Sequence, residues 1–254
     1  ADGDDKFRIR DLIVNADDFG LSDGVTQGIL DAMKRGIVTS TTMMVNMPGT
    51  QSAAAIARGN PDLAVGLHVN ISLGSPLTNG PSLTEKGMFL KPSALGSDDR
   101  YDEEELYQEM RAQYHRFVEL TGRTPTHMDS HLYAHQKFTK ASCAIRRLAE
   151  EEKLPVRDLA TSRFSRTYFE GSFKVKPGET PEDLKEKCLC LIRSLSGYPV
   201  AEMMVHPAFP DEWLLNNSSY NAQRSMEHAV LTDPDVCQYI SKAAVTLATF
   251  RDLE

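Results

Sequence analysis

The chain has 254 residues, which is enough for one large α/β domain, since a closed eight-stranded barrel uses about 250 residues. Apolar residues make up 41% of it, charged residues make up 25%, and the formal net charge is −8. This acidic balance argues against a nucleic-acid partner, and no apolar stretch has the length that a membrane anchor requires. A neutral substrate fits the composition better than a polyanion.

Short apolar runs alternate with helical patterns along the chain. Strands are predicted at residues 11–16, 40–46, 63–71, 126–131, 154–159, 167–175, 202–206 and 245–250. Helices are predicted at residues 23–35, 52–58, 102–120, 139–152 and 181–194, followed by a helical region at 223–239. Residues 72–100 contain Gly and Pro and are predicted to be a long irregular loop, of the kind that forms lids or binding walls.

This alternation determines the predicted fold. Repeated strand–helix units imply a parallel sheet flanked by helices, and the chain has no glycine-rich dinucleotide-binding loop. We therefore predict an α/β fold, namely a (β/α) barrel that is TIM-like or irregular, with seven or eight strands. No repeat or linker divides the sequence, so residues 1–254 are predicted to be a single domain, with residues 1–8 as a disordered tail.

The cysteines and the first residues indicate the cellular compartment in which the protein is expected. None of the four cysteines forms a Cys-x-x-Cys pair, and Ala1-Asp-Gly-Asp-Asp-Lys6 lacks a basic segment followed by an apolar core. Neither a disulfide framework nor a signal peptide is predicted. A cytoplasmic protein is therefore expected.

Two adjacent acids, Asp17 and Asp18, end the first predicted strand, in the run Asp11-Leu-Ile-Val-Asn-Ala-Asp-Asp-Phe-Gly20. Neighbouring carboxylates repel, and local conflicts of this kind are expected where function overrides stability. Two acids with different surroundings can divide the work, one binding a cation while the other moves protons. The alternative is that the pair only caps the following helix.

Polar side chains recur near the ends of three later strands. His68 falls late in the third strand, and His206 ends the seventh. His127, Asp129 and His131 alternate in the fourth, which places them on one face. Because the carboxyl ends of parallel strands converge at one mouth of a barrel, we predict that these side chains meet the two acids there. A single strand histidine would more often be a satisfied core residue, so the prediction depends on the group as a whole.

Carboxylate and imidazole together favour a divalent cation. One Asp with two His leaves positions open for water and substrate, as in catalytic sites. Zinc suits these ligands well, whereas magnesium is less comfortable with two imidazoles. One divalent metal ion, Zn or Mg, is therefore the predicted cofactor.

Three further residues are candidates for the wall of a sugar-binding groove. They are Tyr133, Arg157 and Trp213. A flat apolar face can stack on a sugar ring, but purely structural roles are equally open for all three.

Five segments carry a resemblance to a known family. In chain order they are Asn15-Ala-Asp-Asp-Phe-Gly20, Val38-Thr-Ser-Thr-Thr42, Gly66-Leu-His68, Pro125-Thr-His-Met-Asp-Ser-His131 and His206-Pro-Ala-Phe209. Together they resemble the YdjC-like carbohydrate deacetylases, which include chitooligosaccharide deacetylases, from about residue 10 to the end. The resemblance implies a barrel-like fold related to the NodB-type polysaccharide deacetylases. It also implies removal of N-acetyl groups from amino sugars or short N-acetylglucosamine oligosaccharides.

Roles for individual residues follow from the same resemblance. It implies that Asp18, His68 and His131 bind the metal. It further implies that Asp17 is the general base that activates water and that His206 is the acid that protonates the departing amine.

The remaining motif residues are expected to contact the substrate or to support the ligands. These are His127, Asp129, Tyr133 and Arg157. Tyr133 is a departure, because a histidine is common at its position in the family, which puts the substrate contacts beside the metal in question. A small carbohydrate is the expected partner, and a homodimer is an expectation at the level of the family.

Two other functions are weighed against deacetylation. A metal-dependent hydrolase of a phosphoester or cyclic amide would be favoured by arginines clustered near the site, and none is obvious in the sequence. A catalytically silent sugar-binding protein would have no need of Asp17, because a binding module requires no base beside its ligand. Deacetylation is therefore the predicted function.

Overall fold

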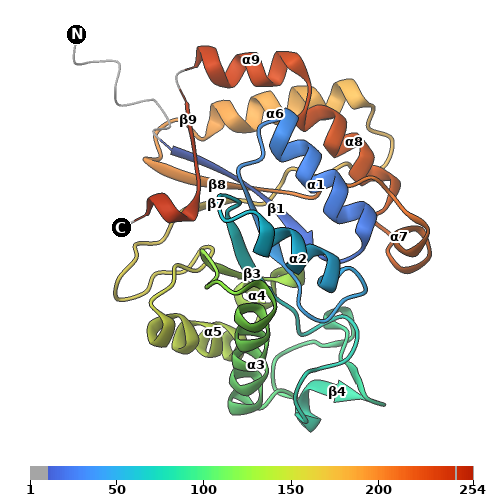
Figure 1. Ribbon diagram of the computed structural model, residues 1–254, viewed down its shortest axis with the longest axis vertical. Coiled ribbons are helices and arrows are strands. Elements are labelled where there is room, and N and C mark those ends of the chain that lie inside the picture. The colour runs from blue at the N-terminus through green and yellow to red at the C-terminus, as the bar shows by residue number, and fades with distance from the viewer. Residues whose placement is uncertain (1–10, 244, 254) are drawn as a thin grey trace.

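The computed structural model of the chain describes residues 11–243 and 245–253 (Figure 1). The predicted tail at residues 1–8 lies outside these ranges. Among the described helices, none has both the length and the apolar character needed to cross a bilayer.

A seven-stranded parallel sheet forms the centre of the described chain. Its strands are β1 (Asp11–Phe19), β2 (Ser40–Met43), β3 (Val65–Val69), β6 (Met128–Ser130), β7 (Tyr168–Glu170), β8 (Val200–Val205) and β9 (Thr246–Ala248). The order is β6-β3-β2-β1-β8-β7, and β9 pairs with the first three residues of β1. Because β6 and β7 are the ends of this order, the sheet is a parallel half-barrel. The predicted α/β class and irregular seven-stranded form are confirmed.

Helices cover this sheet and make up most of the remaining structure. They are α1 (Asp23–Arg35), α2 (Thr50–Gly59), α3 (Glu103–Thr121), α4 (Ala134–Lys137), α5 (Thr139–Glu152), α6 (Pro181–Ser194), α7 (Glu212–Asn217), α8 (Ala222–Leu231) and α9 (Pro234–Lys242). Figure 1 shows α1, α6, α8 and α9 gathered in one part of the molecule and α3 with α5 in another.

Local chemistry explains where the best-predicted helices begin and end. The hydroxyl of Ser22 accepts a hydrogen bond from the backbone N–H of Val25 and so caps α1. Thr180 and Asp183 form a reciprocal capping box at the start of α6. Gly122 ends α3 in the left-handed region, with a φ of 70°, which glycine adopts without steric cost.

Three predicted elements differ from the structure. The strand predicted at 154–159 is wrong, because Val156 makes only isolated bridges and the left-handed Asp158 turns the chain away. The helical region predicted at 223–239 is two helices, since Pro234 begins a new one at α9.

The third difference concerns the long loop at 72–100, which is not wholly irregular. It contains a two-stranded antiparallel ribbon formed by β4 (Thr84–Glu85) and β5 (Met88–Phe89). Single 3₁₀ turns flank this ribbon, at Pro81–Leu83 and Pro92–Ala94.

Candidate metal centre

A cavity of about 510 Å³ opens at the carboxyl ends of the parallel strands. Five side chains predicted from the sequence line it, and they are Asp17, Asp18, His68, His131 and His206. They come from the end of β1, from β3, and from the residues that directly follow β6 and β8. The convergence predicted for the strand ends is confirmed for these five side chains, whereas His127 and Asp129, which were predicted to join them, do not line the cavity.

An irregularity in β1 turns both acids toward this cavity. The pairing of β1 with β2 advances three residues from Ala16 to Phe19 while β2 advances only two, which is a β-bulge. Asp18, inside the bulge, has a φ of 76°. On a regular strand adjacent side chains point to opposite faces, so the bulge is what allows Asp17 and Asp18 to line one cavity.

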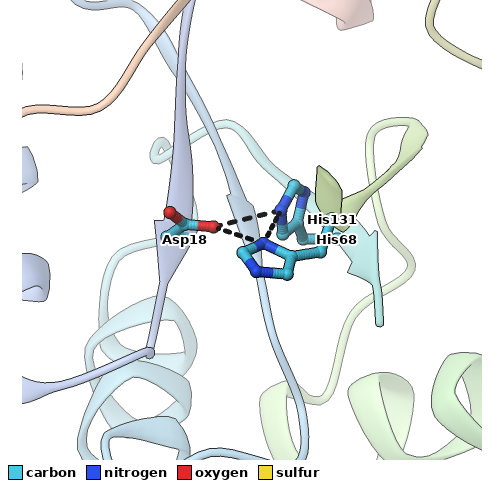
Figure 2. Close-up of side chains that lie close together, drawn as sticks. All are labelled: Asp18, His68 and His131. Atoms are coloured by element: carbon cyan, nitrogen blue, oxygen red, sulfur yellow. Dashed lines mark hydrogen bonds and ion pairs between the residues drawn. The ribbon is translucent and has the colours of Figure 1, made fainter. Parts of the chain in front are cut away.

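Three ligand atoms form a compact triangle at the floor of the cavity (Figure 2). Oδ1 of Asp18 lies 3.1 Å from Nε2 of His68 and 3.1 Å from Nδ1 of His131, and the two ring nitrogens are 3.3 Å apart. Ligands at about 2.0–2.1 Å from a tetrahedral ion stand roughly 3.3 Å from one another. These atoms also belong to a group that can hold a metal ion. The residues present therefore fit a divalent cation.

The environment of His68 fixes which nitrogen faces the triangle. Its Nδ1 lies 2.6 Å from Oδ1 of Asp129, whose other oxygen accepts a hydrogen bond from the hydroxyl of Thr42 at 2.9 Å. Burial would lower the pKa of His68, but Asp129, together with Asp18 and Asp17, raises it to about 10. A carboxylate behind a ligating histidine is the usual way of orienting the ring and selecting its tautomer. Asp129 thus supports His68 rather than contacting the cavity.

Arg157 lies beneath the cavity among three carboxylates and is only 1% exposed. Its guanidinium donates to both oxygens of Asp17, at 2.6 and 2.9 Å, and to Glu202 at 2.7–3.2 Å. It also lies 3.0 Å from Asp129. Burial opposes its charge, but the three acids raise the pKa of Arg157 well above its ordinary value. Arg157 therefore holds Asp17 and is not among the residues that line the cavity, so of the two roles left open for it the geometry agrees with the supporting one.

The imidazole of His206 faces Asp17 within the cavity. Its Nε2 lies 3.7 Å from Oδ2 of Asp17. Burial lowers the pKa of His206 to about 4, so the imidazole is neutral at neutral pH. The backbone N–H of His206 donates to the buried carboxylate of Glu227 at 2.8 Å, which fixes the start of the segment that follows β8.

His127, Tyr133 and Trp213 lie in three different settings. The ring of His127 is fully buried and stacks on Phe250, with ring centroids 3.7 Å apart, and it does not line the cavity. Tyr133 and Trp213 both line it. Tyr133 and its neighbour Leu132 have φ values of 58° and 54°, so the backbone directly after His131 is in the left-handed region twice in succession.

Sequence reasoning missed several buried partners of the cavity residues. They are Thr42, His135, Glu202, Arg224 and Glu227. Glu202 had a visible signal, because an acid inside the apolar run Val200-Ala-Glu-Met-Met-Val205 is as conspicuous as Asp17 and Asp18. Arg224 and Glu227 lie on a polar helix more than 200 residues from β1, and their spacing alone carried no signal.

These features define a class of protein, namely parallel α/β half-barrels that carry an Asp–His–His cluster at the carboxyl ends of their strands. The chain belongs to the YdjC-like family, whose model matches residues 11–242. It is 38% identical to carbohydrate deacetylase 2 of Listeria innocua, over 95% of this chain and 98% of that protein. It is 41% identical to a carbohydrate deacetylase of Geobacillus stearothermophilus, over 96% and 98% of the two chains.

Solved structures are similar over the same length. A crystal structure of an Enterococcus faecalis V583 protein, described only provisionally as a cellobiose-phosphate cleavage protein, superposes with a TM-score of 0.84. It is 34% identical and covers 95% of this chain and 97% of its own. A cobalt-bound acetyl xylan esterase from Clostridium thermocellum is 12% identical, with a TM-score of 0.53 over 94% and 88% of the chains. At this identity the second likeness concerns the fold alone.

Proposed function

We propose that the protein is a metal-dependent carbohydrate deacetylase that removes N-acetyl groups from amino sugars or short N-acetylglucosamine oligosaccharides. One observation carries this proposal: the triangle of Asp18, His68 and His131 lies beside a second acid, Asp17, that belongs to the same cavity but not to the triangle. Two relatives that match almost full length are named carbohydrate deacetylases, which supports the same function. The chain is proposed to act as one domain.

Asp18, His68 and His131 are the residues proposed to hold one divalent cation, Zn or Mg. A cation bound there would lower the pKa of a coordinated water and polarise the acetyl carbonyl. Three protein ligands leave coordination positions open, as catalytic sites require. Two imidazoles among the three favour zinc over magnesium.

Asp17 and His206 are proposed to move the protons. Arg157 grips both oxygens of Asp17, so this carboxylate is fixed in direction and cannot swing toward the triangle. A proton that Asp17 takes from water at Oδ2 would reach Nε2 of His206, 3.7 Å away, through one bridging water, and would pass from there to the departing amine. An imidazole whose pKa is about 4 gives up such a proton readily.

The walls of the cavity suit a sugar better than a flat apolar ligand. Trp213 and Tyr133 supply aromatic surface, while Ser72, Ser93 and Asn217 supply hydroxyl and amide groups around it. Sugars combine apolar ring faces with many hydroxyls, so a mixed wall of this kind fits them.

Acetate release tests the proposal. Purified protein is incubated with N-acetylglucosamine oligomers of two to five units, with and without a chelator, and free acetate and free amine are both measured. The proposal expects acetate and amine in equal amounts, loss of both on chelation, and recovery when zinc or magnesium is restored. Cleavage of another bond, or sugar binding with no acetate under any metal, would show that the proposed reaction is wrong.

A further inference from the structure

We propose that Arg224 is a positioning residue for the candidate metal centre. Its guanidinium holds one oxygen of Asp18, so that only the other oxygen is presented to His68 and His131. This inference rests on the proposed function, because it concerns the same cation site. It adds a residue that lies on α8, far along the chain from the strands that supply the ligands.

The two oxygens of Asp18 have separate partners. Nη1 of Arg224 donates to Oδ2 at 2.8 Å, whereas Oδ1 is the atom that lies 3.1 Å from both ring nitrogens. Asp18 is 1% exposed and Arg224 is 4% exposed, so little water competes for this ion pair. A charge-assisted hydrogen bond out of water is short and directional, and it therefore fixes the orientation of the carboxylate.

Arg224 is itself held at several points. Its Nε donates to the backbone oxygen of Tyr220 at 2.8 Å, which fixes the direction of the guanidinium. Its own backbone oxygen accepts from the N–H of Ala208 at 3.1 Å, which ties α8 to the segment that follows His206. An arginine anchored in this way can impose a position on Asp18 rather than follow it.

Helix α8 also reaches the other side of the cavity. Glu227, one turn beyond Arg224 on α8, accepts from the backbone N–H of His206 and from the hydroxyl of Tyr220. Helix α8 therefore contacts both the end of β1 and the residue that follows β8. This makes the helix a support for the cavity rather than a surface element.

Asp18 needs such a support more than an ordinary ligand does. It lies in a β-bulge at a φ of 76°, where the ladder with β2 is interrupted. Without a partner for Oδ2, the carboxylate can rotate about its own bonds and offer either oxygen, or both, to a cation. Holding Oδ2 keeps the carboxylate to one donor atom and leaves more of the coordination shell open.

Charge repulsion and positioning predict opposite effects of removing Arg224 on metal affinity. A guanidinium cation close to the site repels a metal cation, so its removal would tighten metal binding if repulsion dominated. Positioning predicts that removal weakens binding. The sign of the change in affinity therefore distinguishes the two explanations.

The test uses Co²⁺ as the probe, titrated into the metal-stripped full-length protein, with affinity measured by chelator competition and coordination followed by visible absorption. Arg224→Met keeps the length of the side chain and removes its donors, and Arg224→Lys keeps one charged donor. Arg123→Met is the matched control, because within the described part of the chain the guanidinium of Arg123 donates to backbone oxygens of Ala57, Asn60 and Leu63, away from the cavity.

We expect Arg224→Met to bind Co²⁺ about 10–100-fold more weakly, with a changed absorption band, as for other groups that orient metal ligands. Arg224→Lys should recover part of the affinity, and Arg123→Met should bind as the unaltered protein does. If Arg224→Met does not fold, as judged by circular dichroism, Arg224→Gln and Arg224→Lys carry the same comparison.

Equal or tighter binding with an unchanged band in the folded Arg224 variants would overturn the inference, as would an unaltered protein that binds no Co²⁺. Co²⁺ binding is measured without substrate, so the outcome is separate from that of acetate release. If Co²⁺ binds as expected but no acetate is released, the proposed reaction fails while the role of Arg224 stands.

Discussion

The floor and the walls of the cavity are built in different ways. The floor consists of buried side chains at strand ends, such as Asp17, Asp18 and His68, each held by charged partners that are themselves buried. The walls come from turns and helix starts, and Leu132 among them is 52% exposed. Groups that carry out chemistry need fixed positions, whereas groups that select a substrate can vary with the loops that bear them.

The floor gains fixed geometry at a cost in stability. Arg157 stands among Asp17, Asp129 and Glu202 with essentially no exposure to water. Taking charges out of water costs several kcal/mol for each ion, and the attraction between them repays this only when the geometry is good. Such a cluster is therefore better understood as positioning Asp17 than as stabilising the fold.

The walls are attached by bonds from side chains to backbone. Glu109 of α3 accepts from the N–H groups of Leu77 and Thr78, and Glu105 accepts from that of Ser82. These two acids hold the loop at 72–100 through its backbone, while Leu83, Phe89 and Leu90 of the same loop are buried in the hydrophobic core. The exposed positions of this wall can thus change without disturbing the floor, whereas its core residues cannot.

Removing the proposed base should have the largest effect on activity. Asp17→Asn keeps the shape of the side chain, but an amide cannot accept the proton, so we expect kcat to fall by about 10²–10⁴-fold. Metal content, measured by elemental analysis, should stay at the level of the unaltered protein. Near-normal turnover would remove Asp17 from the proposed role.

Removing the positive charge of Arg157 should have the largest effect on stability. Arg157→Leu leaves three buried acids without their partner, which costs about 3–5 kcal/mol. The melting temperature should fall by roughly 10 °C in a protein of this size. Arg166→Leu is the control, because that arginine is 65% exposed and, among the described residues, pairs with Asp158 alone, so its melting temperature should hardly change. Similar shifts in melting temperature for the two variants would contradict the distinction between the buried and the exposed arginine.

The pH dependence of stability should reveal the ionisation of Glu227. Burial raises its pKa from 4.5 to about 7. For an acid with a raised pKa, the contribution to stability is complete below pH 4.5 and is lost as the pH rises through 7. Glu227→Gln cannot ionise, so its melting temperature should fall less than that of the unaltered protein between pH 5 and pH 8. Parallel curves for the two proteins would contradict this expectation.

A change in the wall should have the smallest effect. Trp213→Ala removes apolar surface from the cavity but touches none of the buried charges. We expect KM for an N-acetylglucosamine oligomer to rise several-fold while kcat stays within about twofold, as for a group that binds substrate and transition state alike. Loss of kcat with KM unchanged would show that the walls and the floor are not independent.

The residues on the floor of the cavity could be predicted from the sequence, whereas several of the residues that hold them in place could not. Asp18, His68 and His131 could be brought together because each ends or follows a strand of a parallel sheet, and that topology follows from the alternation of elements. The position of Arg224 depends instead on how α8 packs beside the residues that follow β8. No spacing rule relates that packing to β1.

Close contacts of α1 illustrate why such packing was not predictable. A Cβ at Gly24 would lie 2.1 Å from the backbone oxygen of Phe209, and one at Gly28 would lie 2.4 Å from Ala208. These two glycines let the helix press against the segment after His206, but in the sequence they appear only as weak helix formers. Their role depends on contacts between residues 180 to 185 positions apart.

The irregularity in β1 has a consequence for anyone who would rebuild this centre elsewhere. A left-handed conformation at a residue other than glycine costs of order 1–3 kcal/mol, and at Asp18 it is kept because two acids must share one cavity. Transplanting the same side chains onto four idealised strands would send one of the two acids out through the sheet. A designed copy must therefore reproduce the extra residue of the strand before it reproduces any ligand.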